Sequence, residues 1–598
     1  MSEFQQGGGY LIEKAGSRKI QTPEGFSDEQ KELYRNVFKF TEEQVLPLKE
    51  RIDNKEEGLM LSILKKAGEE LGLFMIDIPE KYGGLAMDKT SSMLAAEACS
   101  FDGSFAVSVG AHVGIGTLPI VWFGNEQTKA KYLPKSATGE WIGAYALTES
   151  GSGSDALAAK SKAVLSSDGK FYILNGTKQF ITNAGFADYF IVFAKIDGEK
   201  FTGFVVDRNT PGLTIEPEEH KMGINGSSTC ALTFEDCKVP VENVLGEIGK
   251  GHRIAFNILN VGRLKLGVGA IGGAKYMLKE AILYAKERKQ FGVPIITFGA
   301  LKQYVAEMAA YIFAAESLVY RTAGLIDAKA EKLDKNSPKY DDEVIKIIEE
   351  YVVEASIGKV YGSECLDFVV DRGLQMFGGY GYSEEYPAAR GYRDARINRI
   401  FEGTNEINRL LIPGMLLKHS MKQMIDLMTP IQNLNKALEG NKLDELPLKP
   451  EGNDLLSTAI RNIEMAKRIC LYASNTAIMK YMMELEKQQM ILFYMADMMI
   501  ETYAGDSAIS RALQAKDVYG ADDARAKVMS DMASLTAASA YTKCWSLALE
   551  LVSAVAKGKE LDKHIDNLDK LWVRETTNRV ELKERIAAYF VEKEKYLL

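Results

Sequence analysis

The sequence predicts a mainly α-helical protein with a small antiparallel β-domain in its middle and an additional helical bundle at its C-terminus. Between residues 171 and 207 the chain consists of short segments rich in β-branched and aromatic residues, separated by glycine-containing turns. This pattern is typical of strands and hairpins. The long segments on both sides repeat apolar residues at a spacing of three and four, as amphipathic helices do. The chain of 598 residues is too long for one core, since a domain holds about 150 residues.

These changes of pattern divide the chain into four parts. We expect an N-terminal helical domain over 1–143, a β-domain over 144–250, a second helical domain over 251–417 and a C-terminal helical domain over 418–598. The strands are expected at 171–182, 188–196 and 201–207. The helices are expected at 61–73, 90–98, 252–288, 299–330 and 343–378, with a polar linker at 331–342.

The C-terminal part contains two apolar stripes at helical spacing. They indicate the core of a helical bundle, rich in methionine and alanine, rather than a cofactor site. The stripes comprise Leu456, Ala459, Ile460, Ile463, Ala466, Cys470 and Ala473, and Leu485, Leu492, Phe493, Ala496, Met499, Ile500 and Tyr503.

The composition narrows the class of protein. Lys and Arg number 73 against 82 Asp and Glu, for a formal net charge of -9, so the chain lacks the basic footprint of a nucleic-acid-binding protein. The six cysteines form no C-x-x-C pair, which argues against a disulfide framework and against a zinc site. We find no signal sequence and no run of about 18 uninterrupted apolar residues. The protein is therefore expected to be soluble and cytoplasmic, without a metal.

One glycine motif resembles a nucleotide-binding signature and is rejected. Gly267, Gly269 and Gly272 have the G-x-G-x-x-G spacing of a dinucleotide-binding turn, and Glu287 follows at a suitable distance. That turn requires a strand before the glycines, whereas residues 258–267 have the pattern of a helix. We expect these glycines to let two helices approach closely instead.

Glu402 is the candidate for acid–base chemistry. It follows the apolar residues Ile400 and Phe401 and precedes Gly403, and a glycine lets a ligand approach the backbone closely. A carboxylate beside an apolar slot has its pKa raised towards neutrality and can then act as a base. Taken alone, a glutamate at this position also fits the exposed start of a helix.

Several motifs within residues 30–415 occur in the order and spacing of one enzyme family. They are PEKYGG (79–84), FGNEQTKAKYLP (123–134), AYALTESGSGSDA (144–156), KQFITNAG (178–185), MGINGSSTCALTFEDCKVP (222–240), ERKQFG (287–292), QMFGGYGY (375–382) and RIFEGTNEINR (399–409). Together they resemble the acyl-CoA dehydrogenase family. The additional C-terminal helices most resemble its very-long-chain branch. The resemblance implies a helical domain, a β-domain and a second helical domain that enclose FAD.

The resemblance also implies which residues contact FAD. The family's Y-x-x-T segment lines the flavin, and Phe180 stands where the family usually has tryptophan, which keeps an aromatic wall but removes the indole N–H. Arg288 and Gln290 match residues that reach the FAD of a neighbouring subunit. The expected set is Tyr145, Leu147, Thr148, Gly153, Ser154, Phe180, Ile181, Thr182, Arg288, Gln290, Phe291, Phe298, Gln375, Gly378, Gly379, Thr404 and Glu406.

By the same resemblance, Glu402 is the base that takes the α-proton of an acyl thioester. Hydride acceptance needs a redox cofactor, because no side chain accepts hydride. Some relatives carry the base just before the residue that matches Arg263, and Gly262 at that place leaves Glu402 as the candidate. The thioester carbonyl is expected to be polarised by the Glu402 N–H and a ribityl hydroxyl of FAD. The expected substrate contacts are Ser154, Asn260, Arg263, Gly403, Ala106 and Gly110.

Ala106 and Gly110 bear on the length of the acyl chain. Medium-chain relatives close the acyl slot with bulky polar side chains at the matching positions, whereas these two residues carry almost none. A long acyl chain is therefore expected, with about 0.8 kcal/mol gained for each buried methylene. The alternative is that Gly110 serves helix packing and another residue closes the slot.

The implied activity is FAD-dependent α,β-dehydrogenation of a fatty acyl-CoA to trans-2-enoyl-CoA in fatty acid β-oxidation, with electrons passed to an electron-transferring flavoprotein. A homodimer is implied, in which the C-terminal domain takes the place of a second dimer. Two alternatives stay open: an acyl-CoA oxidase that uses oxygen, and a non-enzymatic assembly role such as one relative with this layout has. The exact chain length, the electron acceptor and peripheral contact with a membrane also stay open.

Overall fold

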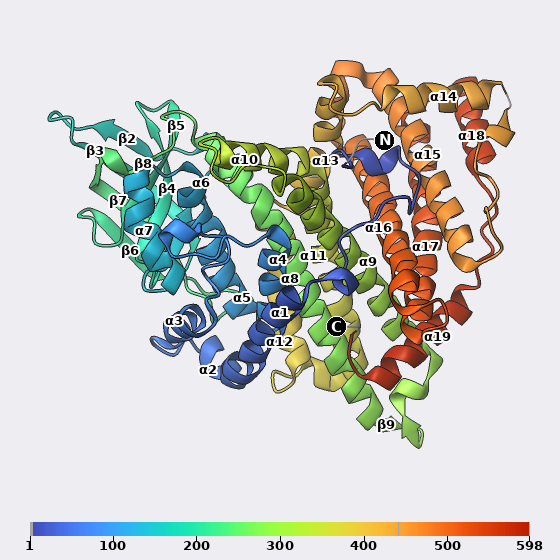
Figure 1. Ribbon diagram of the computed structural model, residues 1–598, viewed down its shortest axis with the longest axis horizontal. Coiled ribbons are helices and arrows are strands. Elements are labelled where there is room, and N and C mark those ends of the chain that lie inside the picture. Colours follow the sequence, from blue (N-terminus) through green and yellow to red (C-terminus); the bar gives the residue numbers. More distant parts are fainter. Residues whose placement is uncertain (1–3, 441, 597–598) are drawn as a thin grey trace.

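The computed structural model describes residues 4–440 and 442–596. It confirms a mainly helical protein with one small β-sheet domain (Figure 1). The side chains of Ser27, Asp88 and Asp102 accept hydrogen bonds from backbone N–H groups and so begin the first, fourth and fifth helices. The elements before the sheet are α1 (Asp28–Phe40), α2 (Lys49–Asp53), α3 (Leu59–Leu71), α4 (Lys89–Cys99), α5 (Gly103–Gly110), a π-helix (Ala111–Gly116), α6 (Leu118–Phe123) and α7 (Glu126–Thr138).

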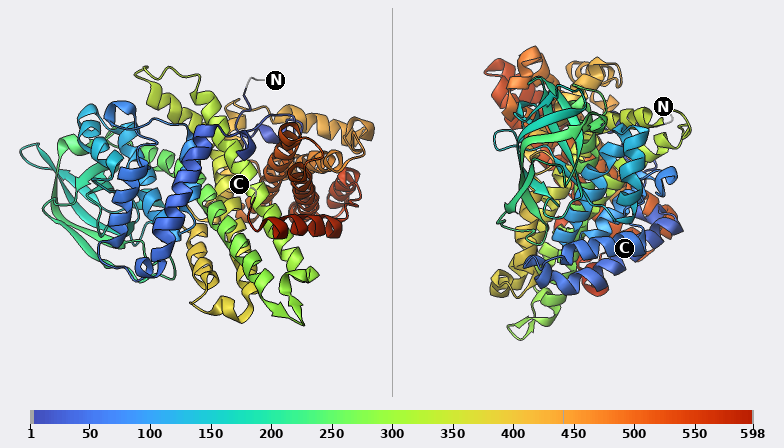
Figure 2. Two further views of the ribbon diagram at one scale, coloured as in Figure 1. Left: turned by 60° about the horizontal axis from the view of Figure 1, so that its bottom comes forward. Right: turned by 90° about the vertical axis from the view of Figure 1, so that its left-hand side faces the viewer.

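The sheet forms one side of the molecule and lies in front of the helices in the right-hand view of Figure 2. Its order is β6-β7-β3-β2-β4-β5-β8, and β1 pairs with β4. The three expected strands are confirmed as β3, β4 and β5. The strands are β1 (Gly143–Ala146), β2 (Lys162–Leu165), β3 (Phe171–Thr182), β4 (Tyr189–Ile196), β5 (Lys200–Asp207), β6 (Leu213–Glu218), β7 (Thr229–Pro240) and β8 (Val244–Leu245).

The sheet is mainly antiparallel, as expected, with parallel pairings at one strand. β4 pairs in parallel with both β1 and β2, while the remaining pairings are antiparallel. Parallel neighbours need long connections rather than a hairpin turn, and the chain between β1 and β4 is long enough to return in the same direction. No local turn signal in the sequence could reveal this pairing.

The helices after the sheet carry the loop of Glu402. The expected helix at 343–378 is instead two helices, because Tyr351 leaves helical geometry between them. Its hydroxyl donates a hydrogen bond to the carbonyl oxygen of Gln5 at 2.7 Å, a contact that no local pattern indicates. The elements are α8 (Gly251–Glu287), β9 (Lys289–Gln290), β10 (Val293–Pro294), α9 (Gly299–Ala330), α10 (Tyr340–Glu350), α11 (Val352–Phe377), α12 (Pro387–Ala395) and α13 (Asn405–Met421).

The glycines of the rejected nucleotide motif lie inside α8 and allow close helix packing, as expected. A Cβ at Gly267 would lie 2.7 Å from the carbonyl oxygen of Gly358 on α11. A Cβ at Gly272 would overlap the carbonyl oxygen of Glu97 on α4. These positions therefore bring α8 against two neighbouring helices.

The C-terminal helices share a continuous core with the second helical group. Glu316 on α9 accepts hydrogen bonds from Lys275 on α8 and from Arg511 on α16. Both expected apolar stripes are buried or partly buried, although Leu485 precedes α16. The helices are α14 (Met428–Glu439), α15 (Leu455–Tyr481), α16 (Gln489–Tyr519), α17 (Ala524–Val555), α18 (Lys559–Leu571) and α19 (Arg579–Lys593).

The N-terminal segment runs across to these C-terminal helices. The hydroxyl of Tyr10 donates a hydrogen bond to the carbonyl oxygen of Met499 at 3.3 Å, and Glu24 pairs with Arg511 at 2.7 Å. The first residues of the chain thus contact its last third, which the sequence did not indicate. The four domain boundaries remain predictions.

Two helical segments are long and apolar enough to cross a membrane by length and composition alone. They are Gly103–Phe123 and Gly251–Glu287, and 72% of the apolar window of each is buried inside the protein. Such burial is the pattern of core helices.

Candidate active site

The loop before α13 directs Glu402 into the interior. Glu402 and Gly403 have successive positive φ angles of 57° and 81°, a backbone conformation that side chains other than glycine rarely adopt. Thr404 then begins α13, because its hydroxyl accepts a hydrogen bond from the N–H of Ile407 at 3.2 Å. The buried Oε2 atom of Glu402 has no hydrogen-bond partner among the described residues. A strained loop thus presents a carboxyl group with a free oxygen.

Burial raises the pKa of Glu402 to about 7, and the nearby charges of Arg263 and Lys359 oppose this rise. The same burial lowers the pKa of Arg263 to about 10 and that of Lys359 to about 7. A carboxyl group that titrates near neutrality can both take and release a proton at physiological pH. The electrostatics therefore suit Glu402 to act as a general base.

Arg263 and Asn260 hold the Glu402 loop from α8. The guanidinium of Arg263 donates hydrogen bonds to the Asn260 side-chain oxygen at 2.8 Å and to the backbone carbonyl of Glu402 at 3.3 Å. The backbone N–H of Glu402 has no acceptor within the part of the chain that the structure describes. That N–H is free to bind a carbonyl oxygen of a ligand.

A cavity of about 600 Å³ extends from Glu402 between α4, α5 and α8. Ala106 and Gly110 both line it, and a Cβ built on Gly110 would meet no atom within 4 Å. Gly110 therefore leaves open space and does not serve close helix packing. The walls include Cys99, Val109 and Leu266, which are almost fully buried.

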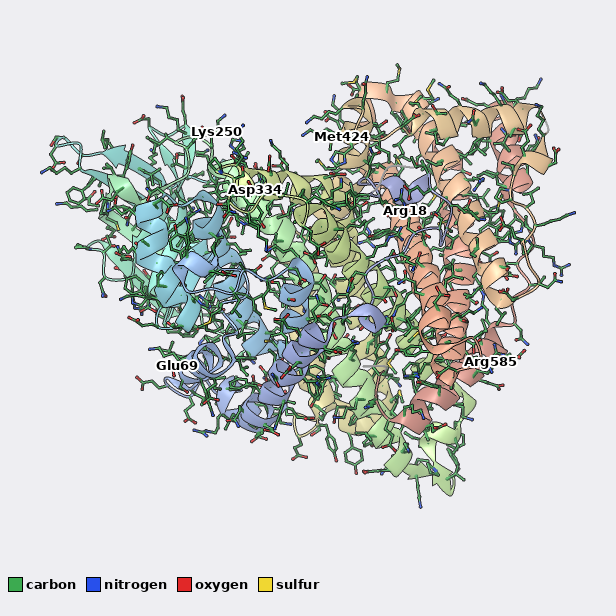
Figure 3. All side chains as sticks on the ribbon, viewed as in Figure 1. Arg18, Glu69, Lys250, Asp334, Met424 and Arg585 are labelled. Carbon is green, nitrogen blue, oxygen red and sulfur yellow. The ribbon has the colours of Figure 1, made fainter. Side chains whose placement is uncertain are left out.

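A second cavity of about 1080 Å³ lies on the other side of Asn260 and Arg263, which both line it. It is bounded by α8, α10 and α13, and Figure 3 shows two of its lining residues, Lys250 and Met424, on opposite sides of the upper face. Glu402 and the α8 residues beside it thus stand between a smaller cavity and a larger one. Four lining lysines form no ion pair within the described ranges: Lys250, Lys346, Lys418 and Lys422.

The residues expected at the flavin ring lie on β1, in the loop after it and at the end of β3, with Tyr145 and Thr182 near Glu402. Tyr145 lies on β1, and its buried hydroxyl has no hydrogen-bond partner among the described residues. A bulge in β3 gives Phe180 a φ of 60° and leaves its ring 59% exposed, which is how a bulge redirects a side chain. Ile181 is buried, and Thr182 lines the smaller cavity.

These features fit a flat aromatic cofactor. Leu147 and Thr148 follow β1, with their carbonyl oxygens bound by Lys178 and Gln179. Gly153 and Ser154 are exposed in the loop that follows, and a Cβ on Gly153 would meet no atom within 4 Å. An exposed aromatic ring, an unpaired hydroxyl and open space at a glycine together leave room for the isoalloxazine ring.

The residues expected at the distal parts of FAD lie elsewhere on this chain. Arg288 packs its guanidinium over the ring of Tyr380 at 5.4 Å, beside the hairpin β9–β10 at the lower tip of Figure 1. Phe291 is 93% exposed there. The residues expected at the distal parts of FAD therefore form a second group at the surface, separate from the first. This group comprises Arg288, Gln290, Phe291, Phe298, Gln375, Gly378 and Gly379. Thr404 and Glu406 lie at the start of α13, with Glu406 exposed.

Sequence reasoning missed Lys359 on α11. This fully buried lysine donates a hydrogen bond to the side-chain oxygen of Asn405 at 2.6 Å. Asn405 lies three residues after Glu402 in the chain. Lys359 forms no ion pair in the described part of the chain. The available signal was a lysine with the apolar neighbours Ile357, Val360 and Tyr361 on a predicted helix, since lysine is almost never fully buried without a reason.

Comparison with known proteins assigns the chain to a class. Family models described as the acyl-CoA dehydrogenase N-terminal, middle and C-terminal domains match residues 27–140, 144–237 and 249–416. A further acyl-CoA dehydrogenase C-terminal domain model matches residues 465–570. The fold and the matched segments thus define a flavoprotein dehydrogenase with an additional C-terminal helical part.

Individual relatives narrow the assignment. A probable acyl-CoA dehydrogenase of Bacillus subtilis is 45% identical over 597 residues, which cover 100% of this chain and 99% of the relative. The very long-chain specific acyl-CoA dehydrogenase of Bos taurus mitochondria is 34% identical over 505 residues, covering 81% of this chain and 74% of that protein. A crystal structure of an acyl-CoA dehydrogenase complexed with FAD from Bacillus anthracis is 45% identical, with a TM-score of 0.95 and coverage of 99% and 100%.

The chain therefore belongs to the acyl-CoA dehydrogenase family. It is an enzyme with FAD as its cofactor, which confirms both predictions from the sequence.

Proposed function

We propose that the protein dehydrogenates long-chain fatty acyl-CoA to trans-2-enoyl-CoA in fatty acid β-oxidation and passes the electrons to an electron-transferring flavoprotein. The observation that carries this proposal is the position of Glu402. Its carboxyl group stands between a smaller cavity with apolar walls and a larger cavity rimmed with lysines. An acyl-CoA thioester has this division into an apolar acyl tail and an anionic CoA head.

The chemistry assigned to the chain's own residues is proton abstraction and polarisation of the thioester. The Glu402 carboxylate takes the α-proton, and its raised pKa supports that role. The free N–H of Glu402 donates a hydrogen bond to the thioester oxygen, where negative charge develops. FAD, when bound, supplies the acceptor for the hydride that leaves the β-carbon. Gly403 permits the close approach of the thioester to the backbone.

The CoA head is assigned to the larger cavity. Asn260 and Arg263 line its inner end beside Glu402, where they suit contacts with the thioester region. Lys250, Lys346, Lys418 and Lys422 surround it without ion pairs in the described part, so they can bind phosphate groups as point charges. Ser154 is proposed to contact the substrate from the exposed loop after β1.

A long acyl tail is supported by the open space at Ala106 and Gly110. A side chain of ordinary size at Gly110 would enter the cavity and shorten it. Each further buried methylene contributes about 0.8 kcal/mol, so the preference should rise with chain length until the cavity is filled. The name of the Bos taurus relative agrees with this direction.

The proposal also includes a homodimer in the cytoplasm. Phe291 and Tyr382 are 93% and 87% exposed, and large aromatic rings exposed next to Arg288 are suited to contact a second copy and its FAD. The six cysteines are all free and buried, which is usual in a reducing compartment.

The test is anaerobic reduction of the flavin by saturated acyl-CoAs of four to twenty carbons, measured as bleaching of its visible absorbance. We expect bleaching and a trans-2-enoyl-CoA product, with the highest specificity constant at twelve carbons or more. An optimum at eight carbons or fewer would contradict the long-chain assignment. Reoxidation by oxygen as fast as by an electron-transferring flavoprotein would identify an oxidase instead.

A further inference from the structure

The cavity that starts at Glu402 has a second end of different chemistry. On α8, one face lines it from Gly262, beside Glu402, to Tyr276. At the far end Tyr276 packs edge-on against Phe101, with ring centroids 5.9 Å apart. The lining there also includes residues from α2 and α12, which are joined by the ion pair between Asp53 and Arg390.

The length of this cavity can be read from α8. Gly262 and Tyr276 are separated by fourteen helical steps, or about 21 Å at 1.5 Å per residue. A carbon chain with bonds of about 1.5 Å advances roughly 1.25 Å per carbon. An acyl chain of about sixteen to eighteen carbons therefore spans the distance from Glu402 to Tyr276.

The middle of the cavity is apolar at the depth that a twelve-carbon chain reaches. Leu366 lies there, beside Gly273 of α8, and Leu266 lines the part nearer to Glu402; both are almost fully buried. A hydroxyl group placed among them would lose its hydrogen bonds to water without replacement, at a cost of about 1–3 kcal/mol.

The far end, in contrast, is polar and open. Arg390 on α12 contacts Asp53 at 2.6 Å and Asp102 at 2.8 Å. The hydroxyl of Tyr276 has no hydrogen-bond partner, and Lys49 has no ion pair, in the part of the chain that the structure describes. Exposed residues Glu50 and Glu384 also line this end, so it reaches solvent.

We propose that this distal end is a subsite for a polar ω-terminus, so that the enzyme accepts ω-hydroxy acyl-CoA of about sixteen carbons nearly as well as the unsubstituted chain. The inference rests on the proposed long-chain acyl-CoA function. Tyr276 exchanges a hydrogen bond with the ω-hydroxyl group, which keeps its contact with water through the open end.

The charge of the subsite selects among polar groups. More acidic than basic residues line it. The acidic residues are Glu50, Asp53, Asp394, Glu384 and Glu385, and the basic residues are Lys49 and Arg390. An ω-carboxylate would meet net negative charge, whereas a neutral hydroxyl would not. The subsite therefore favours ω-hydroxy chains over dicarboxylic chains of the same length.

The experiment compares specificity constants for flavin reduction in the holoenzyme. We expect the specificity constant of 16-hydroxyhexadecanoyl-CoA to be within about threefold of that of hexadecanoyl-CoA. The specificity constant of 12-hydroxydodecanoyl-CoA should be roughly five- to hundredfold lower than that of dodecanoyl-CoA, because only the shorter chain leaves its hydroxyl group in the apolar middle. The sixteen-carbon ω-carboxy chain should be at least about tenfold worse than the hydroxy chain. Equal losses for both hydroxylated chains would overturn the inference. Absence of reduction by both unsubstituted chains would overturn the proposed function, and the inference with it.

Two variants test the role of Tyr276. Tyr276→Phe should lower the ratio of the specificity constant for 16-hydroxyhexadecanoyl-CoA to that for hexadecanoyl-CoA by about two- to tenfold, the worth of one hydrogen bond. Tyr284→Phe is the matched control, since Tyr284 lies on α8 two turns further on, is stacked on Phe377 at 4.2 Å, and does not line the cavity. An unchanged ratio of the two constants in Tyr276→Phe would contradict the subsite.

Discussion

The carboxylate of Glu402 occupies the space that a side chain at position 262 would need. A Cβ built on Gly262 would lie 2.5 Å from Oε2 of Glu402 and 3.1 Å from Oε1. Gly262 on α8 and Glu402 before α13 are therefore complementary in shape. The two segments are far apart in the chain, since Arg263, which follows Gly262, is 139 residues from its hydrogen-bond partner Glu402. The sequence suggested only that Gly262 cannot be a base.

Gly262→Ala should displace the base without unfolding the protein. The atom it meets is the end of a flexible side chain, so the carboxylate can rotate away at little cost, but it then loses its alignment with the substrate. We expect flavin reduction to slow by about tenfold to a hundredfold, the effect of a misplacement of about 1 Å. Gly414→Ala on α13 is the control, because a Cβ there meets nothing within 4 Å. Equal rates in the two variants would contradict the steric relationship.

The pH dependence of kcat/KM should report the ionisation of Glu402 in the free enzyme. Burial raises its pKa to about 7, and the ionised form is the active one. The value of kcat/KM should therefore rise with pH below about pH 7 and level off above it. A profile that is flat between pH 5.5 and pH 8.5 would be inconsistent with this assignment.

Lys359→Met should move this profile to higher pH. The Lys359 charge favours ionisation of Glu402, so its removal should raise the pKa of the base by about one unit. The other charged groups around Lys359 are Arg263, Glu364 and Glu406, and they remain in the variant. Ser363→Ala removes a neutral partner of Asn405 and should leave the profile in place. A shift of equal size in both variants would show that packing, not charge, is responsible.

Gly110→Glu should shorten the preferred substrate. The new side chain would project into the open space beside Gly110 and fill the cavity beyond it. The optimum of the specificity constant should move to shorter chains, while short substrates react as before. Gly414→Glu, at an exposed position of α13, should leave the optimum where it is. An unchanged optimum in Gly110→Glu would place the acyl chain elsewhere.

Arg288→Ala should weaken retention of FAD. In the proposed dimer Arg288 supplies a charge-assisted contact to a phosphate of the partner's cofactor. The flavin content after dialysis should fall, with the oligomeric state unchanged. Lys289→Ala alters the neighbouring exposed residue and serves as the control. Full and equal flavin occupancy in both variants would remove Arg288 from the cofactor site.

Local patterns predicted much of this molecule. The strand at 171–182 is confirmed residue for residue as β3, because alternation and turn glycines are local properties. The parallel partner of β4 and the interruption at Tyr351 were missed, since both depend on segments far away in the chain. Lys359 was missed for the same reason: its burial beside the Glu402 loop arises only when α11 packs against α13. The positions that the resemblance gave, such as Ala106 and Gly110, do line a cavity, but their roles remain predictions.

The most direct test of the account is the rate of anaerobic flavin reduction by hexadecanoyl-CoA in Glu402→Gln. Glutamine has nearly the same shape, so the variant should fold, retain FAD and bind the substrate. We expect reduction to slow by about a hundredfold to ten-thousandfold, the usual worth of a positioned general base. A rate within about threefold of the unmodified enzyme would contradict the assignment of Glu402 as the base.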